Sequence, residues 1–115
     1  MSFRVMAQCI PTAIELNILP TIADQFKNIQ FYRGCNQTYS SWLNMIFVSD
    51  QFNAENISDY EYFILFHELG HIMHKHSINS RNQELEADRF AIAMVVKYQL
   101  DISAIDLAIK REVTR

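Results

Sequence analysis

Two histidines four residues apart, with a glutamate directly after the first, are the residues of this chain best suited to chemistry. They stand in the segment His67-Glu68-Leu69-Gly70-His71, which matches the HExxH pattern of zinc hydrolases. Residues i and i+4 project from one face of an α-helix, so both imidazoles could bind one Zn²⁺ at about 2.0–2.1 Å. Glu68 would lie beside the ion without binding it, and there it could accept a proton from a water that zinc makes more acidic. The spacing predicts a zinc site with His67 and His71 as ligands and Glu68 as general base.

A third protein ligand is available downstream of His71, on a segment that contains Glu84, Glu86 and Asp88. Polar residues between the two segments suit a turn, so the second segment can return as a helix against the first. Glu84 and Asp88 share one face of that helix with apolar residues. Glu86 and Arg89 lie on a polar face, where we expect them to form a solvent-exposed ion pair. We therefore predict Glu84 as the third metal ligand. Asp88 is predicted to accept a hydrogen bond from the outer N–H of a ligating histidine.

Together the two motifs resemble the ImmA/IrrE-like family of small bacterial and phage metallopeptidases. That family pairs HExxH with a downstream E-x-E-A-(D/N)-x-F-A helix, matched here by Glu84, Glu86, Ala87, Asp88, Phe90 and Ala91. The resemblance covers about residues 28–99 and implies a minimal gluzincin-like fold, zinc on His67, His71 and Glu84, and Glu68 as base. It also implies a cytoplasmic endopeptidase that cleaves a transcriptional repressor or another regulatory protein. The leucine-rich stretch ending in proline that follows in many members is missing from this chain.

Two other interpretations remain open. Cys35, after Arg33-Gly34, is similar to the glycine-cysteine that supplies the third ligand in peptide deformylases, although the other deformylase motifs are absent. A buried free thiol is the simpler interpretation of Cys35, and with Cys9 far away in sequence no disulfide framework is expected. The second alternative is a zinc-stabilised binding protein, of phage or mobile-element origin, that antagonises a regulator without cutting it. An intact Glu68 favours the enzyme, because a binding protein needs no base beside the metal.

Other residues near the motif invite a role. His74 and His76 are expected to be solvated histidines favoured by the helix dipole, with a metal role for His74 as the alternative because it lies at i+3 from His71. Gly70 destabilises a helix, so it indicates a close approach of another backbone. A tyrosine could stabilise the oxyanion opposite the metal. The candidates are Tyr39, Tyr60, Tyr62 and Tyr98, of which Tyr62 is expected to pack in the core.

The helices that must hold these residues are predicted from apolar periodicity. Ser58 with Glu61 forms a capping box that starts the motif helix. The second helix is expected over about residues 83–99, and a short closing helix over residues 103–110. Residues 12–28 also have helical spacing, which Pro20 must interrupt.

The sheet is predicted from β-branched and aromatic residues. Strands are expected at about residues 29–33, 38–43 and 44–49. They would form a small antiparallel sheet of two or three strands, with Met45 and Phe47 packed under the motif helix and Ile46 as an open alternative there. An edge strand could hold an extended peptide by β-augmentation. The predicted fold class is α+β, a small antiparallel sheet packed on the HExxH helix and a second ligand-bearing helix.

Composition agrees with a small enzyme. The chain has 115 residues, half of them apolar, so it should bury about two thirds of its unfolded surface as a single domain over residues 1–115. A net charge of −3 without lysine or arginine runs argues against nucleic-acid binding. No apolar run reaches the length of about 18 residues that a membrane span needs, and the start of the chain does not resemble a signal peptide. We expect a cytoplasmic protein whose partner is a protein or peptide substrate.

Overall fold

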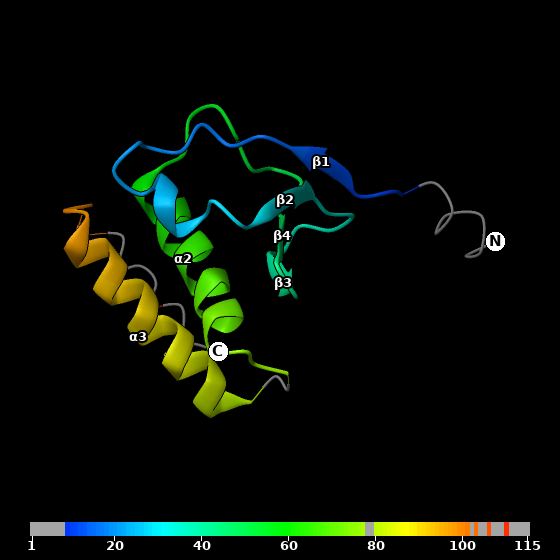
Figure 1. The fold of residues 1–115 in the computed structure, drawn as a ribbon. Coiled ribbons are helices and arrows are strands. Elements are labelled where there is room, and N and C mark those ends of the chain that lie inside the picture. The colour runs from blue at the N-terminus through cyan, green and yellow to red at the C-terminus, as the bar shows by residue number, and fades with distance from the viewer. Residues whose placement is uncertain (1–8, 78–79, 102, 104–105, 107–109, 111–115) are drawn as a thin grey trace.

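Two helices and a four-stranded sheet form an α+β fold in the computed structural model, which describes residues 9–77, 80–101, 103, 106 and 110 (Figure 1). Helix α2 lies between the sheet and helix α3. The predicted fold class is confirmed. The elements are β1 (Thr12–Ile14), the 3-10 turn η1 (Ala23–Gln25), β2 (Gln30–Arg33), β3 (Ser40–Trp42), β4 (Met45–Val48), α2 (Asp59–Met73) and α3 (Arg81–Lys97).

The sheet is mixed, and the antiparallel arrangement that we predicted is wrong for its centre. The strand order is β1-β2-β4-β3. β1 pairs antiparallel with β2, and β3 antiparallel with β4, but β2 and β4 pair in parallel. The chain reaches β4 through β3, which lies outside β4 at the edge of the sheet, and this detour lets β4 run in the direction of β2. Residue patterns within strands do not encode strand direction, so the sequence predicted the strands without their order.

The face of β4 that packs toward α2 is the opposite of the one predicted. Ile46 and Val48 are fully buried, whereas Met45 and Phe47 are only half-buried. The ring of Phe47 instead stacks on Tyr32 of β2, with 5.6 Å between centroids. Successive strand residues face opposite sides of a sheet. Because all four residues are apolar, their pattern could not indicate which pair faces the helix.

The segment before β2 does not form the helix predicted over residues 12–28. Residues Thr12–Ile14 form β1, and in the rest of that segment only the short η1 turn is helical. Thr12 and Ile14 are β-branched and pair with Arg33 and Phe31 of β2, so tertiary pairing outweighs the helical spacing. The apolar spacing still has a use, because Ile22 and Phe26 flank η1 and are both buried.

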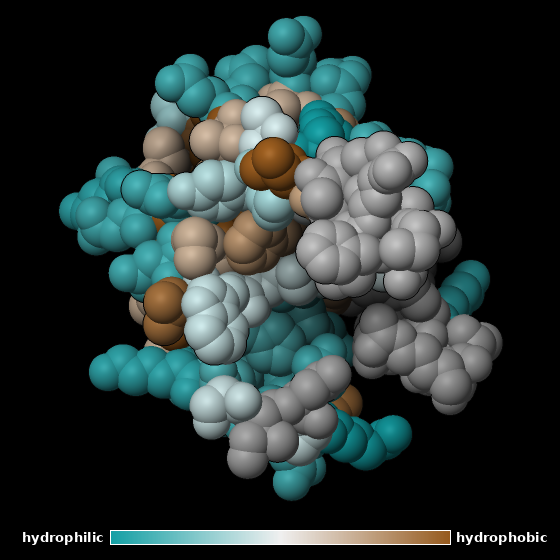
Figure 2. Space-filling view, turned by 90° about the vertical axis from the view of Figure 1, so that its right-hand side faces the viewer, coloured by the Kyte–Doolittle hydropathy of each residue, from teal (hydrophilic) through white to brown (hydrophobic). Residues whose placement is uncertain are grey.

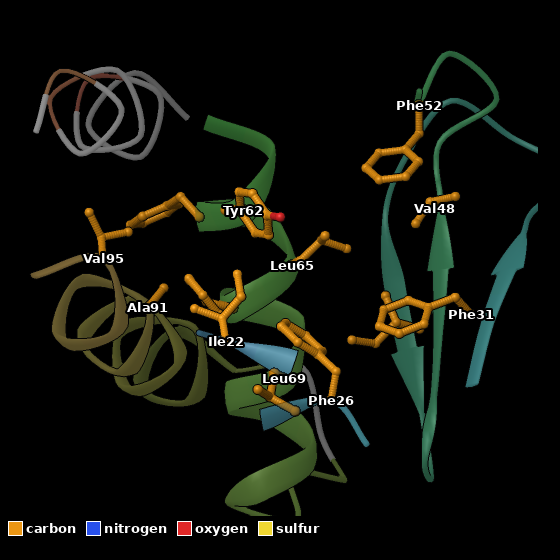
Figure 3. Packing of buried hydrophobic residues seen from close by; sticks show 13 residues of the cluster. Ile22, Phe26, Phe31, Val48, Phe52, Tyr62, Leu65, Leu69, Ala91 and Val95 are labelled. Atoms are coloured by element: carbon orange, nitrogen blue, oxygen red, sulfur yellow. The ribbon is translucent and has the colours of Figure 1, made fainter. Parts of the chain in front are cut away.

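The hydrophobic core lies between α2 and the sheet and continues between α2 and α3 (Figure 3). Phe31, Val48 and Phe52 approach from the sheet side, and Ala91 and Val95 from α3. The α2 residues in this core are Tyr62, Phe63, Leu65, Phe66 and Leu69. One face of α2 therefore packs on the sheet and another on α3, which fixes the helix that carries the HExxH motif.

Both helices begin at serine caps. The predicted capping box is confirmed: the Ser58 side chain accepts a hydrogen bond from the Glu61 backbone N–H, and the Glu61 side chain accepts one from the Ser58 backbone. Helix α3 begins two residues earlier than predicted, because Ser80 accepts a hydrogen bond from the Gln83 backbone N–H. Most of the predicted closing helix over residues 103–110 lies outside the described residues.

A disulfide joins Cys9 to Cys35, which corrects the prediction of a buried free thiol. The two Cα atoms are 5.7 Å apart and both residues are exposed. The pairing of β1 with β2 brings the residues just outside these strands together, and sequence separation had concealed this proximity. Among the described helices none is long and apolar enough to cross a membrane. Figure 2 shows hydrophobic residues interspersed with hydrophilic ones on the face that it presents.

Candidate metal centre

Three side chains with atoms that can bind a metal converge where α2 meets the start of α3. His67 Nε2 and His71 Nε2 are 3.1 Å apart. Glu84 faces both, with Oε1 3.2 Å from His67 Nε2 and Oε2 3.0 Å from His71 Nε2. The structure thus brings together the three residues predicted as ligands, in a group close enough to bind one metal ion.

A close contact between the helices makes this convergence possible. Gly70 lies between the two histidines on α2, and a Cβ added there would be 3.1 Å from the Ala87 Cα and 3.2 Å from the Phe90 Cβ of α3. The predicted close approach of another backbone at Gly70 is confirmed. Because the helices touch there, the first turn of α3 lies near the motif face of α2, and Glu84 reaches both imidazoles.

Asp88 lies on the other side of the His67 ring from the converging donor atoms. Its Oδ1 is 2.7 Å from His67 Nδ1. Asp88 stands one turn after Glu84, so the two carboxylates contact opposite nitrogens of the same imidazole. A carboxylate can only accept, so a neutral His67 carries its proton on Nδ1 and presents a lone pair at Nε2.

The chemistry of this donor set fits a zinc ion. The Nε2 lone pair of a neutral His67 faces a carboxylate and a second imidazole nitrogen, an arrangement of acceptors that a shared cation would stabilise. Donor atoms of a tetrahedral zinc site are about 3.3 Å apart, as follows from ligand distances of about 2.0–2.1 Å. The two Nε2 atoms, 3.1 Å apart, are close to that value, and each lies 3.0–3.2 Å from one of the two oxygens of Glu84. Two histidines and one glutamate are also a ligand set that catalytic zinc sites use.

The electrostatics distinguish the two histidines. Burial by itself lowers the pKa of His67, but the hydrogen bond to Asp88 and the charges of the nearby carboxylates outweigh it and raise the pKa above 6.5. The pKa of His71 is lowered, first by burial and then by the charge of His67. Because a raised pKa means tighter proton binding, a metal ion bound by these side chains would compete with a proton mainly at His67.

The side chain of Glu68 lines a cleft of about 860 Å³ that His71 and Glu84 also line. One wall is residues 39–44, which include β3, and the other contains Glu68, His71 and Ile72 of α2. Glu84 and residues 75–77 complete the lining. Glu68 itself is 8% exposed. The predicted base therefore lies at the wall of a space large enough for a substrate chain.

The structure sorts the other predicted candidates. Tyr62 is buried, and its hydroxyl accepts a hydrogen bond from the Leu19 N–H, so it belongs to the core as expected. Of the four tyrosine candidates Tyr39 lines the cleft. Cys35 is held in a disulfide and has no thiolate to offer a metal, which removes the deformylase alternative.

Sequence reasoning missed the contacts of His76 and Glu86. His76 Nδ1 is 2.8 Å from His71 Nδ1, and His76 Nε2 is 2.6 Å from Glu86 Oε1. Glu86 is exposed as predicted, but its ion-pair contacts within the described part of the chain are with His74 and His76, where we expected Arg89. The available signal was the number of histidines after the motif, which sequence spacing alone could not connect to a site.

Comparison with known proteins agrees with these observations for part of the chain. No curated protein and no solved structure matches the chain. A family model does match residues 61–104, the segment that holds the HExxH motif and α3. That model describes the Peptidase U49 family, and the match, although it spans less than half of the chain, supports a peptidase.

Proposed function

We propose that the protein is a zinc-dependent endopeptidase in which His67, His71 and Glu84 bind the metal and Glu68 is the general base. The observation that carries this proposal is the convergence of three donor atoms beside a cleft that Glu68 also lines. The match of residues 61–104 to a peptidase family supports the same reaction class. The finer resemblance to the ImmA/IrrE-like peptidases rests on the two motifs described above.

Each residue of the site has a distinct role in the proposed reaction. When bound, zinc supplies Lewis acidity, which polarises the scissile carbonyl and makes a water molecule easier to deprotonate. The Glu68 carboxylate accepts the proton of the attacking water and then delivers it to the leaving amine. Asp88 holds the proton of His67 on Nδ1, which keeps Nε2 free to bind the metal.

The edge strand β3 is the proposed binding site for the peptide backbone. It is the last strand of the sheet, so its outer edge is free of a neighbouring strand among the described residues. Its residues Ser40, Ser41 and Trp42 line the same cleft as Glu68 and His71. An extended substrate that adds to this edge would lie along the cleft, with its peptide bonds next to the donor group. The small serine side chains leave room for that approach.

We further propose that the target is a regulatory protein of the repressor type, cut in the cytoplasm. This part rests on the resemblance of the motifs. In a reducing cytoplasm the disulfide of Cys9 and Cys35 would be an exception, because such bonds are rare there. The oxidation state of these cysteines in rapidly quenched cells therefore tests the location separately from the activity.

Replacing the base while keeping the metal tests the reaction. Glu68→Gln should retain zinc and fold but lose at least about two to three orders of magnitude in peptide cleavage, the contribution expected of a general base. Cleavage is read by mass spectrometry on a peptide library and on repressor proteins encoded near the gene. Glu55→Gln is the matched control, because Glu55 is exposed on the connection before α2.

The metal ligands are tested in parallel. Glu84→Ala should lose most of the zinc that the wild-type protein carries, because one of three protein ligands is removed.

Equal cleavage by wild type and Glu68→Gln would refute the mechanism. Tight binding of a regulator that neither protein cuts would instead support the zinc-stabilised binding protein, although a buried carboxylate at the cleft wall favours the enzyme.

A further inference from the structure

His76 lies against the metal centre although it follows the end of α2. Its side chain is only 8% exposed. Its ring lies 5.0 Å from the His71 ring and 5.5 Å from the His74 ring, centroid to centroid. A solvated histidine at a helix end would not be enclosed in this way, so the contacts of His76 need an explanation.

The end of α2 accounts for the position of His76. The His76 N–H donates to the His71 carbonyl, and the Lys75 N–H donates to the Ile72 carbonyl. These are the two hydrogen bonds of a Schellman motif, with Lys75 as the left-handed residue at φ 55°. The reversal carries the chain back over the last turn of the helix. The imidazole of His76 consequently meets that of His71.

The hydrogen bonds between these groups have one consistent direction when the rings are neutral. The Glu86 carboxylate can only accept, so His76 Nε2, 2.6 Å from Glu86 Oε1, carries a proton. His76 Nδ1 is then an acceptor, and His71 Nδ1, 2.8 Å away, must donate to it. This leaves the lone pair of His71 on Nε2, the atom that faces His67 and Glu84.

We propose that His76 and Glu86 are positioning residues that fix the tautomer and orientation of His71 for metal binding. The inference rests on the proposed metal site. It gives each histidine of the HExxH motif its own carboxylate: Asp88 contacts His67 directly, and Glu86 acts on His71 through His76. Glu84, Glu86 and Asp88, at alternate positions of α3, would thus serve the metal, His71 and His67 in turn.

Zinc affinity, measured by competition with a chelator, is the first test. Glu86→Ala should weaken zinc binding by about tenfold, the lower end of the effect of outer-shell partners, because Glu86 acts through a second ring. Glu86→Gln should recover most of the affinity, since its amide oxygen can still accept from His76. His74→Gln is the control, because His74 Nδ1 also contacts Glu86 Oε1, at 3.4 Å, whereas the contact with His71 Nδ1 is made by His76. The visible absorption of the cobalt-substituted protein should change in Glu86→Ala and stay unchanged in the control.

The tautomer of His71 can also be measured without a metal, by ¹H–¹⁵N NMR of imidazole-labelled protein treated with chelator. At a pH about two units above the ordinary histidine pKa of about 6.5, His71 should be the neutral Nδ1–H tautomer in wild type and a mixture of the Nδ1–H and Nε2–H tautomers in Glu86→Ala. An identical tautomer and identical zinc affinity in the two proteins would overturn the proposal. If wild type takes up no zinc, the proposed function fails, while the metal-free spectra still decide whether Glu86 sets the tautomer of His71.

Discussion

Gly70 of α2 and Ala87 of α3 meet at backbone distance: a Cβ on residue 70 would lie 3.1 Å from the Ala87 Cα and 3.3 Å from its carbonyl oxygen. Such separations are tighter than ordinary van der Waals contact, and the atoms on the α3 side belong to the backbone. In sequence, Gly70 lies between His67 and His71, and Ala87 lies between Glu84 and Asp88. The geometry of the donor group therefore depends on how closely these two helices pack.

Gly70→Val should separate α2 from α3 and weaken the metal site. Overpacking of this kind costs about 1–3 kcal/mol of unfolding free energy, whereas the gain in helix propensity over glycine is below about 1 kcal/mol. Gly70→Ala should have a smaller effect in the same direction. Urea denaturation measures the stability and chelator competition the zinc affinity. A Gly70→Val protein that binds zinc as tightly as wild type would show that helix separation does not set the donor geometry.

The proximity of the predicted ligands could be inferred from sequence because helical geometry is local. A spacing of four residues places His67 and His71 on one face of α2, and the same spacing places Glu84 and Asp88 on one face of α3. Only one tertiary assumption was needed, that the two helices pack together, and Gly70 supplied evidence for it. The capping box of Ser58 was predictable for the same reason.

Features that depend on tertiary pairing could not be predicted in this way. The direction of β4, the face it presents and the strand at residues 12–14 all follow from which segments meet, and no local pattern encodes that. His76 reaches His71 only through the chain reversal at Lys75. Lys75 has a left-handed backbone conformation, which at a helix end is usually adopted by glycine or asparagine, so the sequence did not indicate it. The disulfide likewise depends on β1 lying beside β2.

Reduction of the disulfide should destabilise the fold. Cys9 and Cys35 are 26 residues apart, and a loop of this length corresponds to about 3–4 kcal/mol of unfolding free energy in the chain-entropy model. Urea denaturation of the wild type with and without a reductant measures the difference. Cys35→Ser is the control, because its stability should not respond to the reductant. Equal stability of the oxidised and reduced wild type would contradict the expectation.

Trp42→Ala should weaken substrate binding with little effect on the folded state. Trp42 is 65% exposed at the end of β3 and lines the cleft, so its removal leaves no buried cavity. A large exposed aromatic at the rim offers apolar contact to a substrate side chain. We expect KM for a cleaved peptide to rise several-fold while kcat changes little, because Trp42 is neither one of the proposed metal ligands nor the proposed base. Leu19→Ala is a matched control, since Leu19 is an exposed apolar residue outside the cleft lining. A fall in kcat at constant KM would exclude the rim contact.

The contribution of Asp88 to stability should depend on pH in the metal-free protein. The pKa of His67 lies above its ordinary value of 6.5, and the hydrogen bond that His67 donates to Asp88 is the largest of the effects that raise it. Protonation of His67 therefore favours the folded state. That stabilisation is fully present below pH 6.5 and is lost as the pH rises through the raised pKa. The lowered pKa of His71 has the opposite effect, because its contribution is present above pH 6.5 and is lost as the pH falls through the lowered pKa.

Comparison of the wild type with Asp88→Asn isolates the His67 contribution, since both proteins retain His71. The difference in unfolding free energy between them should be larger at about pH 5.5 than at about pH 8, values that bracket the ordinary histidine pKa. Urea denaturation in the presence of a chelator provides both measurements. Asn keeps an acceptor for His67 Nδ1–H, so the difference that remains at the higher pH reports hydrogen-bond geometry, and the part that grows at the lower pH reports the charge of Asp88 on a protonated ring. A difference that is constant with pH, or larger at the higher pH, would mean that Asp88 does not act on the protonated form of His67.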